Sequence, residues 1–403
     1  MAMYGGKGLK IVHIVDHYYP ELGYQIYYIA SKMKDFGNDV IIVTSNRHSP
    51  VVFEEDAMKD VLGSRYLEAS DKMIDGLRII RLKTLFEFGS TVFLQDLKKT
   101  LEELKPDVIY IHGITTISAI LCSLKSYIPK STQLIYQTYQ IESGSFGWHR
   151  IFYPFFKLLF TRRIIAKASL FIAIAEESKV FAINKIGIPT KRIKVLQHGA
   201  DPIVFYMDET KREETRRKLY IHEDDIVFIY TGKILPYKCV YQLVESTLIL
   251  LQEFNSLKLL IVGGGSKQYI DQIKKKVIDS SQEGNIIFHD AVNHRELPEY
   301  YCCADVAVWP CSVTIATLEA MASSLPVIVS DVPAAIERIQ FSNGYGVSIQ
   351  EDNLTMTMRK LIINEHLRKE LGKNGRRIIE EKLNWNAITL AIINEIYQSK
   401  THD

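Results

Sequence analysis

Two lysines lie close together in the segment TGKILPYK, residues 231–238, directly after an apolar run. Gly232 opens this segment, and the side chains of Lys233 and Lys238 can both point into an adjoining cleft. A glycine lets the backbone approach a ligand closely, and two cations beside it would neutralise a leaving diphosphate. The alternative is a pair of solvated lysines on an ordinary loop. The segment predicts an anion site with Lys233 and Lys238 as its charged groups.

A second candidate anion site lies within residues 304–331, where an apolar run is followed by a helical pattern. The helix is expected to start near residues 312–314, whose hydroxyl side chains suit N-capping. Glu319 would then fall one to two turns inside the helix, where it can accept hydrogen bonds from a ribose diol. The backbone N–H groups that would bind the anion belong to Val313, Thr314 and Ile315.

Two further glycine-bearing segments follow apolar runs. VGGG, residues 262–265, does not match GxGxxG, and no acidic residue stands where a dinucleotide ribose needs one, which argues against a nicotinamide site. Its glycines, Gly264 among them, permit close approach of a nucleobase or of a neighbouring loop. Near the N-terminus, Gly23 and Tyr24 precede a helix start, where a phosphate can approach backbone N–H groups. The alternative there is a tight turn.

Short apolar runs alternate with helical blocks along almost the whole chain. This alternation predicts α/β architecture with parallel sheets and right-handed crossovers, and ligands of such sheets bind beyond the carboxyl ends of the strands. In the first half we expect strands at 10–15, 39–45, 77–82, 107–112, 133–139, 170–175 and 192–201. In the second half we expect them at 225–233, 257–265, 285–290, 305–310, 326–331 and 344–349.

Length and composition set the broad class. A chain of 403 residues predicts two domains rather than one core. Pro202 and the polar stretch 208–217 place the domain boundary after residue 202. Hydrophobic residues make up 47% and charged residues 24%, as in folded globular proteins, and a net charge of +2 is too balanced for a nucleic-acid partner.

The five cysteines form no CxxC pair and have no histidine partners at zinc-ligand spacing, so we expect no metal. An odd number of cysteines without a framework suits a reducing compartment. The N-terminal stretch lacks the apolar core of a signal peptide, and no run has the 18 or more apolar residues of a membrane span. We therefore expect a cytoplasmic protein.

One segment is both aromatic and basic. Residues 149–167, HRIFYPFFKLLFTRRIIAK, intersperse aromatic and aliphatic side chains with lysines and arginines. Such a stretch can lie in a membrane interface beside anionic lipids, which would place the protein peripherally at the inner face of the cell membrane. The alternative is a core helix with a solvated basic edge.

Taken in order, these segments resemble the retaining glycosyltransferases of family four, the glycosyl transferases group 1, which have the GT-B fold. Residues 304–331 are similar to the nucleotide-sugar signature of that family, TGKILPYK to its "GRL…KG" loop and VGGG to its "GxG" loop. The resemblance implies two Rossmann-like domains whose parallel sheets face across a cleft. Residues 1–202, joined by a C-terminal helix 386–403, would form the acceptor side, and residues 203–385 would bind the nucleotide sugar.

The resemblance carries roles to particular residues. Glu319 matches the second of two family glutamates, the one that holds the ribose. His112 matches a histidine near the acceptor cleft, and the alternative is a histidine that is only hydrogen-bonded at the end of a strand. Gln140 stands on the acceptor side where many members have histidine. The sequence departs from the pattern at Cys311, where the first glutamate would fall, and at Cys239, which replaces the glycine after the second cation.

The implied reaction moves a hexose-type residue from a nucleoside-diphosphate sugar to a hydroxyl of a glycan or lipid-linked acceptor, with retention of anomeric configuration. Lys233, Lys238 and helix N–H groups would stabilise the leaving diphosphate without a metal or another cofactor. Two alternatives share the fold. A sugar-nucleotide epimerase would need further acidic and basic residues that the sequence does not offer. A non-catalytic donor-binding or scaffold protein is consistent with Cys311 and Gln140.

Overall fold

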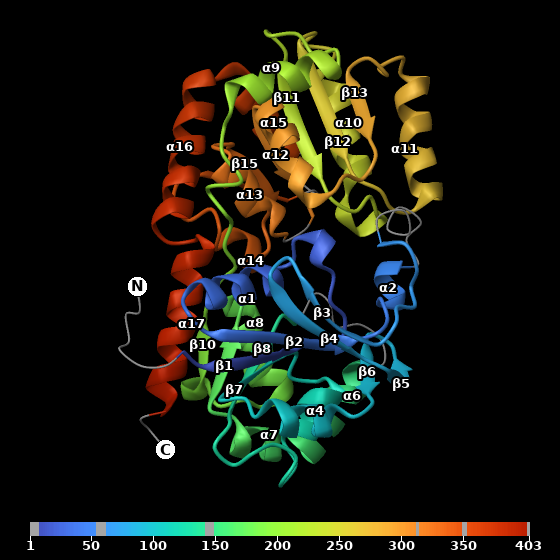
Figure 1. The fold of residues 1–403 in the computed structure, drawn as a ribbon. Coiled ribbons are helices and arrows are strands. Elements are labelled where there is room, and N and C mark those ends of the chain that lie inside the picture. The colour runs from blue at the N-terminus through green and yellow to red at the C-terminus, as the bar shows by residue number, and fades with distance from the viewer. Residues whose placement is uncertain (1–7, 54–61, 142–148, 312–313, 349–352, 401–403) are drawn as a thin grey trace. The chain divides into compact units, whose positions relative to one another are not determined.

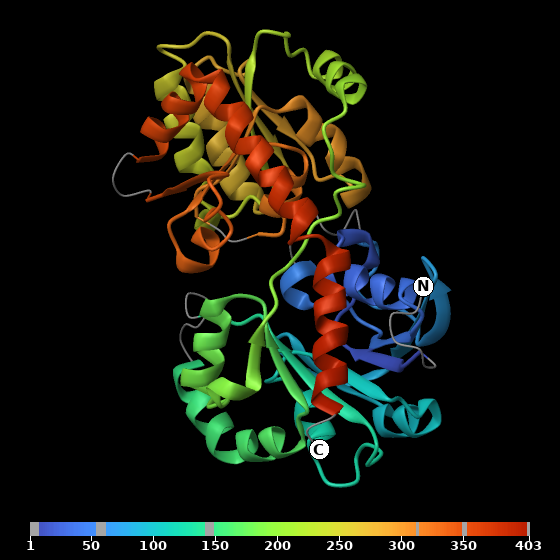
Figure 2. The same ribbon diagram turned by 90° about the vertical axis from the view of Figure 1, so that its left-hand side faces the viewer.

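The computed structural model describes residues 8–53, 62–141, 149–311, 314–348 and 353–400. The chain forms two compact units. The first comprises Met1–Val52, Ser64–His198 and Trp385–Asp403, and the second Phe53–Gly63 and Gly199–Asn384. Each unit contains a parallel sheet flanked by helices, shown in Figures 1 and 2.

Within the described residues, the first unit is built on an eight-stranded sheet in the order β10-β9-β8-β7-β1-β2-β4-β3. All pairings are parallel except that of β3 with β4. Most of its strands are short apolar runs, and β1, β2, β7, β8 and β9 are almost entirely buried, as central strands of a parallel sheet require. The strands are β1 (Lys10–Ile14), β2 (Asp39–Ser45), β3 (Ser70–Ile74), β4 (Leu77–Leu82), β7 (Val108–His112), β8 (Gln133–Thr138), β9 (Leu170–Ala173) and β10 (Ile193–Val195), with a separate hairpin of β5 (Thr84–Phe88) and β6 (Thr91–Leu94).

Helices cover the first sheet, and the last helix of the chain is one of them. The ring of Trp385 in α17 stacks on Tyr28 in α1, with centroids 5.1 Å apart and planes 5° apart. Gln133 at the start of β8 donates to the carbonyl of Ile396, so α17 is held along this unit (Figure 2). The helices are α1 (Gln25–Asp35), α2 (Pro50–Phe53), α4 (Leu97–Leu104), α5 (Ile117–Cys122), α6 (His149–Phe156), α7 (Arg162–Lys167), α8 (Glu176–Phe181) and α17 (Trp385–Lys400), with short turns at Pro20–Leu22, Lys157–Thr161, Ala182–Ile186 and Thr190–Arg192.

The second unit has a six-stranded sheet, again counted over the described residues, in the order β13-β12-β11-β14-β15-β16, and every pairing is parallel. Its central strand β11 lies between β12 and β14, so the loops after these three strands are neighbours at one edge. The strands are β11 (Ile226–Thr231), β12 (Leu257–Val262), β13 (Ile286–His289), β14 (Val306–Trp309), β15 (Val327–Ser330) and β16 (Gly344–Val347). The helices are α9 (Glu209–Lys218), α10 (Val240–Leu250), α11 (Lys267–Asp279), α12 (Leu297–Cys303), α13 (Ala316–Ala322), α14 (Pro333–Ile336), α15 (Asn353–Ile363) and α16 (Glu365–Glu381), with turns at Pro236–Lys238 and His294–Glu296.

The predicted α/β class with parallel sheets is confirmed, and each expected strand is found close to its predicted bounds except the one expected at 192–201, where β10 ends at Val195. The strands β3, β5 and β6 were not predicted, because β3 and β5 are mostly exposed and carry no continuous apolar run. It also started the helix before Glu319 too early. That helix, α13, begins at Ala316 rather than near 312–314.

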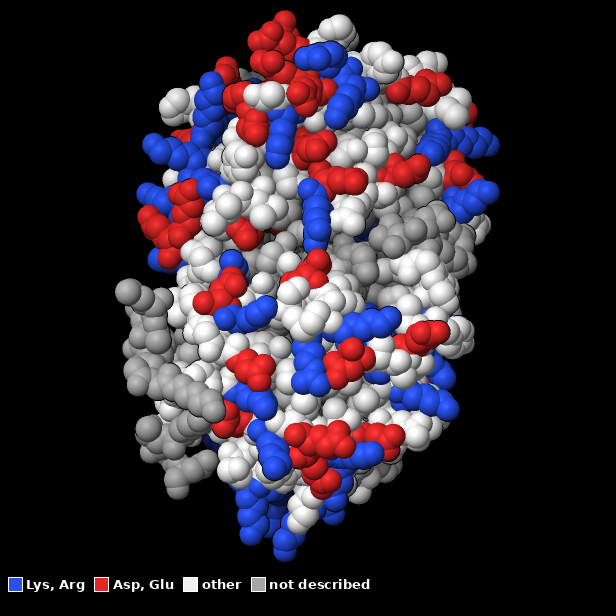
Figure 3. Space-filling view, in the orientation of Figure 1, with Lys and Arg blue, Asp and Glu red and all other residues white. Residues whose placement is uncertain are grey.

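The surface charge is mixed on the face seen in Figure 3, as the near-neutral net charge predicts. The face in Figure 3 carries Lys and Arg interspersed with Asp and Glu over both units. None of the helices in the described part of the chain is long and apolar enough to cross a membrane.

Candidate active site

The loop with the two lysines follows the central strand of the second sheet. Gly232 comes directly after β11 with a φ of 126°, a conformation that side-chain-bearing residues rarely adopt, and no atom would obstruct a Cβ there. Lys233 and Lys238 are both half-buried at this carboxyl edge. The carbonyl of Lys233 accepts from the Tyr230 hydroxyl at 2.7 Å, and the Lys238 ammonium lies 5.2 Å from the centroid of the Tyr237 ring. The loop thus holds two cations on an ordered backbone.

The VGGG segment packs against this loop. A Cβ on Gly263 would lie 1.9 Å from the carbonyl oxygen of Gly232, and one on Gly265 would lie 2.3 Å from that of Ile234. Gly264 is buried, and its carbonyl accepts from the Ile234 N–H at 2.9 Å. Of the two roles expected for these glycines, the close approach of the neighbouring loop is the one these contacts display.

Glu319 lies inside α13 and is held by two side chains from elsewhere in the second unit. His294 Nε2 donates to its Oε1 at 2.6 Å, and the Tyr301 hydroxyl lies 3.5 Å from its Oε2. The Glu319 side chain is 4% exposed. Burial acts to lower the pKa of His294, but the charge of Glu319 and its hydrogen bond together raise it. A ribose diol at Glu319 would therefore share oxygens that already accept from His294 and Tyr301.

The expected anion site before α13 is only partly described. Val313 lies outside the described residues. The Thr314 hydroxyl accepts weakly from the Ala316 N–H at 3.4 Å, and Ile315 is the residue that precedes the helix, without a side-chain cap. Arg338 donates to the Thr314 carbonyl, and burial lowers the pKa of Arg338 to about 10, so it remains cationic at neutral pH. This arginine is a positive group beside the segment that precedes α13.

Sequence reasoning missed two of these partners and one covalent bond. Neither His294 nor Arg338 stands at a spacing that signals contact with α13, because each reaches its partner through the fold. No disulfide framework was expected from the sequence, yet Cys239 and Cys311 are disulfide-bonded, with Cα atoms 5.6 Å apart and a sequence separation of 72. The paired cysteines belong to the loops after β11 and β14.

In the first unit, the segment after β1 turns sharply before α1. Gly23 has a left-handed φ of 61°, and Tyr24 precedes α1 without a side-chain cap. The Tyr24 ring is 37% exposed and meets Tyr19 edge to face at 5.8 Å. The uncapped helix start predicted from Gly23 and Tyr24 is therefore present, at the carboxyl edge of the first sheet.

His112 ends β7 in a buried chain of hydrogen bonds. The Tyr139 and Tyr110 hydroxyls both donate to Gln137 Oε1, at 3.3 and 3.0 Å. His112 Nδ1 then donates to the Tyr139 oxygen, and its Nε2 accepts from His13 Nδ1 at 2.9 Å. Burial lowers the pKa of His112 well below 6.5 and that of His13 to about 3. Both histidines are neutral at physiological pH, so His112 carries no positive charge, and both of its ring nitrogens are engaged by Tyr139 and His13.

Gln140 follows β8 and binds its neighbours by its amide nitrogen. Its Nε2 donates to the Thr115 hydroxyl at 3.1 Å and to the Tyr153 hydroxyl at 3.2 Å. Its Oε1 is buried and has no hydrogen-bond partner within the described part of the chain. The amide oxygen is thus an open acceptor at the same edge of the sheet as His112.

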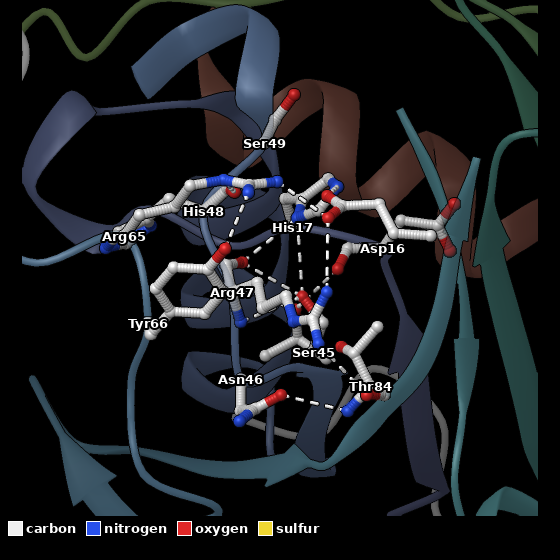
Figure 4. A network of polar contacts seen from close by, with 12 residues as sticks. Asp16, His17, Ser45, Asn46, Arg47, His48, Ser49, Arg65, Tyr66 and Thr84 are labelled. Carbon is white, nitrogen blue, oxygen red and sulfur yellow. Dashed lines mark hydrogen bonds and ion pairs between the residues drawn. The ribbon is translucent and has the colours of Figure 1, made fainter. Parts of the chain in front are cut away.

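A charged network surrounds the ends of β1, β2 and β4 (Figure 4). Glu87 Oε2 accepts from Arg65 at 2.6 Å and from Arg47 at 3.3 Å. His17 Nδ1 donates to the Arg47 carbonyl at 3.0 Å, and burial lowers the pKa of His17. These groups largely satisfy one another, so the network holds the loops of this edge together.

Asp16 joins the same region from the end of β1. It is buried, and its Oδ2 has no hydrogen-bond partner among the described groups. Burial raises the pKa of Asp16 to about 7, against the opposing effect of hydrogen bonds from Thr91 and Val92. The sequence analysis did not single out Asp16, because a carboxyl after a strand is common and only its burial distinguishes it.

Two family models match consecutive parts of the chain. The model described as Glycosyltransferase Family 4 matches residues 22–203, and the one described as Glycosyl transferases group 1 matches residues 211–378. The first match covers most of the first unit and the second most of the second unit.

Curated relatives are distant and are matched over part of their length. An uncharacterized glycosyltransferase, MJ1607 of Methanocaldococcus jannaschii, is 25% identical over 230 residues, which are 55% of this chain and 58% of that protein. The capsular polysaccharide biosynthesis glycosyltransferase CapM of Staphylococcus aureus is 28% identical over 223 residues, 52% of this chain and 57% of CapM. The chain thus spans less than two thirds of the length of these relatives.

Solved structures share the whole architecture. Sucrose-phosphate synthase of Thermosynechococcus elongatus superposes with a TM-score of 0.74 at 18% identity, covering 98% of this chain and 100% of that one. HepE of Anabaena, in complex with UDP, superposes with a TM-score of 0.73 at 16% identity, covering 97% and 100%. The fold is that of the GT-B glycosyltransferases. With both family models matched in order, the chain belongs to the family-four, group 1 glycosyltransferases.

Proposed function

We propose that this protein is a retaining glycosyltransferase that moves a sugar from a nucleoside-diphosphate sugar to an acceptor hydroxyl. The observation that carries the proposal is the loop after β11. Its half-buried Lys233 and Lys238 follow the central strand of a parallel sheet, within the part of the chain that matches the group 1 model. A doubly charged diphosphate at this edge is the ligand that two such cations suit.

In the proposed reaction, the bond between the sugar's anomeric carbon and the diphosphate oxygen breaks as the acceptor oxygen bonds to that carbon from the same face. The acceptor's proton passes to the departing phosphate oxygen, so no protein base is required. Lys233, Lys238 and the cationic Arg338 stabilise the negative charge that develops on the leaving group. Glu319 binds the ribose together with His294.

The acceptor half is assigned to the first unit. Its candidate groups are neutral, as an uncharged hydroxyl requires. His112 is uncharged because it is buried, and Gln140 offers an amide oxygen without a partner within the described residues. We propose that the amide oxygen of Gln140 orients the acceptor by a hydrogen bond, and that His112 contributes by exchanging one of its present hydrogen bonds, to Tyr139 or His13, for one to the acceptor.

The decisive experiment is a donor panel. Purified protein is incubated with UDP-, GDP- and ADP-sugars, and nucleotide release is measured with and without glycan and lipid-linked acceptors. UDP-glucose comes first because the structure of Anabaena HepE has been solved with it. We expect release that depends on one donor class and rises with an acceptor, with the product's anomeric configuration retained by NMR. No release from any donor, with or without acceptor, would overturn the proposal.

We also propose that the reaction needs no divalent metal, because the three cations of the second unit supply the counter-charge. Turnover is expected to survive treatment with EDTA and to gain nothing from added Mg²⁺ or Mn²⁺. A rate that collapses with EDTA and returns with Mn²⁺ would contradict this part of the mechanism.

A lipid-linked acceptor at a membrane surface is the finer proposal, and the segment 149–167 supports it. One side of this segment is core, where Phe156 and Ile164 are almost fully buried. The other side leaves Phe155 59%, Leu158 78% and Leu159 56% exposed. Lys157, Arg162 and Arg163 are exposed beside them, and residues 149–167 contain no acidic side chain. An exposed apolar strip with a basic margin suits an anionic lipid surface.

Co-sedimentation with vesicles tests this surface. Wild-type protein is expected to bind phosphatidylglycerol vesicles more strongly than phosphatidylcholine vesicles. The double variant Leu158→Ser/Leu159→Ser should lose at least about tenfold in binding, since each buried aliphatic side chain contributes to partitioning. Leu85→Ser, an equally exposed leucine in β5, is the matched control and should bind normally. Equal binding of all three proteins to the vesicles would mean that residues 149–167 do not bind the membrane and have only a structural role.

A non-catalytic donor-binding protein is the second candidate, and the disulfide favours it. Cys311 stands where the resemblance places a glutamate, and its sulfur is bonded to Cys239 rather than free to hold a sugar. In that case nucleotide sugars would raise the melting temperature, yet neither transfer nor hydrolysis would follow.

A further inference from the structure

The Cys239–Cys311 disulfide joins two loops of the candidate donor site. Cys239 directly follows Lys238, at the end of the turn Pro236–Lys238 and immediately before α10. Cys311 lies two residues after the end of β14, the strand that pairs with β11. The bond therefore ties the lysine-bearing loop to the neighbouring strand end, across 72 residues of sequence.

The backbone at Cys239 gives this bond a mechanical role. Cys239 has a left-handed φ of 59°, a conformation in which glycine is preferred and other residues are strained. The bond to Cys311 is one restraint on this backbone, beside the hydrogen bond from the Cys239 N–H to the Pro236 carbonyl at 3.2 Å. Since Lys238 precedes Cys239, the restraint also sets the position of the lysine's backbone.

We propose that this disulfide is a redox-sensitive cross-link that positions Lys238 for the diphosphate, so that its reduction weakens nucleotide binding. The inference rests on the proposed function, since it takes the ligand of this loop to be a nucleoside diphosphate. Lys238 is the group that meets the ligand, and the two cysteines are positioning residues that act through it.

The chemistry requires a dithiol reductant. One thiolate of the reductant attacks Cys239 or Cys311, the S–S bond breaks, and a mixed disulfide forms with the other cysteine released as a thiolate. The second thiolate of the reductant then attacks the reductant's sulfur in that mixed disulfide and releases the remaining cysteine as a thiolate. Two electrons pass to the protein, which gains two protons to give two thiols, and the reductant leaves as its own disulfide.

The other three cysteines are more deeply buried than Cys239 and Cys311, so chemical reagents can distinguish the disulfide from them. Cys239 and Cys311 are both half-buried. Cys122, Cys302 and Cys303 are buried thiols. Burial raises the pKa of Cys122 and of Cys303 to about 12 and also raises that of Cys302. Buried, protonated thiols react slowly, so a mild reductant and an alkylating reagent should distinguish the pair from the rest.

Thiol counting by mass spectrometry tests the bond itself. Folded protein purified without reductant is treated with iodoacetamide, digested and analysed before and after brief treatment with dithiothreitol. We expect no alkylation at Cys239 or Cys311 before reduction and alkylation at both after it, with Cys122 unmodified throughout. Two free, alkylated thiols at 239 and 311 in the air-oxidised protein would overturn the proposal.

Nucleotide binding tests the consequence. Titrations with UDP and with GDP are run by calorimetry on the oxidised protein, the dithiothreitol-reduced protein and the double variant Cys239→Ser/Cys311→Ser. The reduced protein and the double variant should bind about three- to tenfold more weakly than the oxidised protein. The double variant should also be insensitive to dithiothreitol. Cys122→Ala, which removes a buried cysteine of the first unit, is the control and should respond to dithiothreitol as the wild type does.

A purely structural cross-link would give a different pattern. Reduction would then lower the melting temperature, by about 4–10 °C for a typical bond, while the nucleotide affinity at 25 °C stayed constant. Where turnover is measurable, loss of positioning should raise the donor KM more than it lowers kcat. Unchanged affinity and unchanged KM after complete reduction would overturn the positioning role.

The two proposals fail separately. If the oxidised protein binds nucleotide in a reductant-sensitive way but transfers no sugar, the glycosyltransferase proposal fails and the cross-link stands. If the oxidised protein binds neither UDP nor GDP, the donor assignment fails together with the positioning role of the disulfide. If sugar is transferred at the same rate and KM in both redox states, only the cross-link proposal is overturned.

Discussion

The candidate polar groups of the two units differ in burial and in charge. In the second unit, Lys233 and Lys238 are half-buried on a loop that follows the central strand. In the first unit, His112 and His13 are buried at strand positions, and burial holds their pKa values low, so they are neutral. Elsewhere in the first unit, Arg47 and Arg65 are paired with Glu87, and Arg81 donates to a backbone carbonyl.

This difference indicates a division of labour. A half-buried cation keeps its charge and can neutralise a ligand's charge, whereas a buried imidazole loses its charge and can only donate or accept hydrogen bonds. The second unit is suited to an anionic ligand such as a diphosphate. The first unit is suited to an uncharged one such as a hydroxyl. Four changes test this contrast, in order of decreasing expected effect.

The largest effect is expected from Lys238→Ala. Loss of one direct counter-charge to the leaving diphosphate should lower kcat/KM by about 100- to 1000-fold, as for other groups that stabilise developing negative charge. Steady-state rates with the preferred donor measure it. Lys218→Ala, a lysine 67% exposed at the end of α9, is the control and should keep the wild-type rate. Near-normal turnover in Lys238→Ala would remove this lysine from the donor site.

Glu319→Gln should destabilise the second unit and change its pH dependence. Removing one partner of a buried pair costs about 3–5 kcal/mol. The folded-state pKa of His294 is raised above 6.5, so the pair's contribution is fully present below pH 6.5 and is lost as the pH rises through that raised pKa. The difference in the free energy of urea-induced unfolding between wild type and Glu319→Gln should therefore narrow from pH 6 to pH 9. A gap that is constant with pH would mean that His294 does not titrate against Glu319.

Asp16→Asn should change the free energy of unfolding by less than Glu319→Gln does, and it should stabilise the protein rather than destabilise it. The folded pKa of Asp16, about 7, lies above the ordinary value of 3.8. The folded state therefore holds the proton more tightly, and wild-type stability falls as the pH rises between these values. At pH 8 the variant should be more stable than wild type, by on the order of 2 kcal/mol. Urea midpoints at pH 4.5 and pH 8 measure it, and equal pH slopes for the two proteins would contradict the expectation.

His112→Asn should have the smallest effect. The amide can replace the imidazole Nδ1–H toward Tyr139, so the loss of turnover should be about tenfold or less. Because the pKa of His112 lies well below 6.5, the rate profile from pH 5.5 to 8 should have the same shape in both proteins. A titration between pH 6 and 7 that is present in wild type and absent in the variant would show that His112 carries a charge during turnover.

Part of the candidate site could be predicted from sequence alone. The run IVFIYT was expected to be a buried strand because it is apolar on both faces, and it is β11. Once that strand is placed, Gly232, Lys233 and Lys238 must follow its carboxyl end, and the structure has them there. The strand β3 could not be predicted, because SDKMI is mostly exposed and its pairing with β4 depends on the fold.

The partners in the site could not be predicted, because each pairing joins distant residues. His294 reaches Glu319 across 25 residues, and Cys239 reaches Cys311 across 72. Neither spacing matches a local period such as that of a helix or strand, so no pattern in the sequence signals the contact. The sequence showed Cys239 and Cys311 as two separate departures from the family, and the fold makes them one bond.

The sequence by itself determined the apolar strands of the two parallel sheets and the loops that carry glycine and lysine, because these follow from local apolar periodicity and from backbone freedom at glycine. Only the tertiary structure decided which side chains meet and which are charged. Desolvation sets the neutral state of His112 and the raised pKa of Asp16, and it depends on the atoms that the whole fold packs around each group. Residue types along the chain do not contain that information.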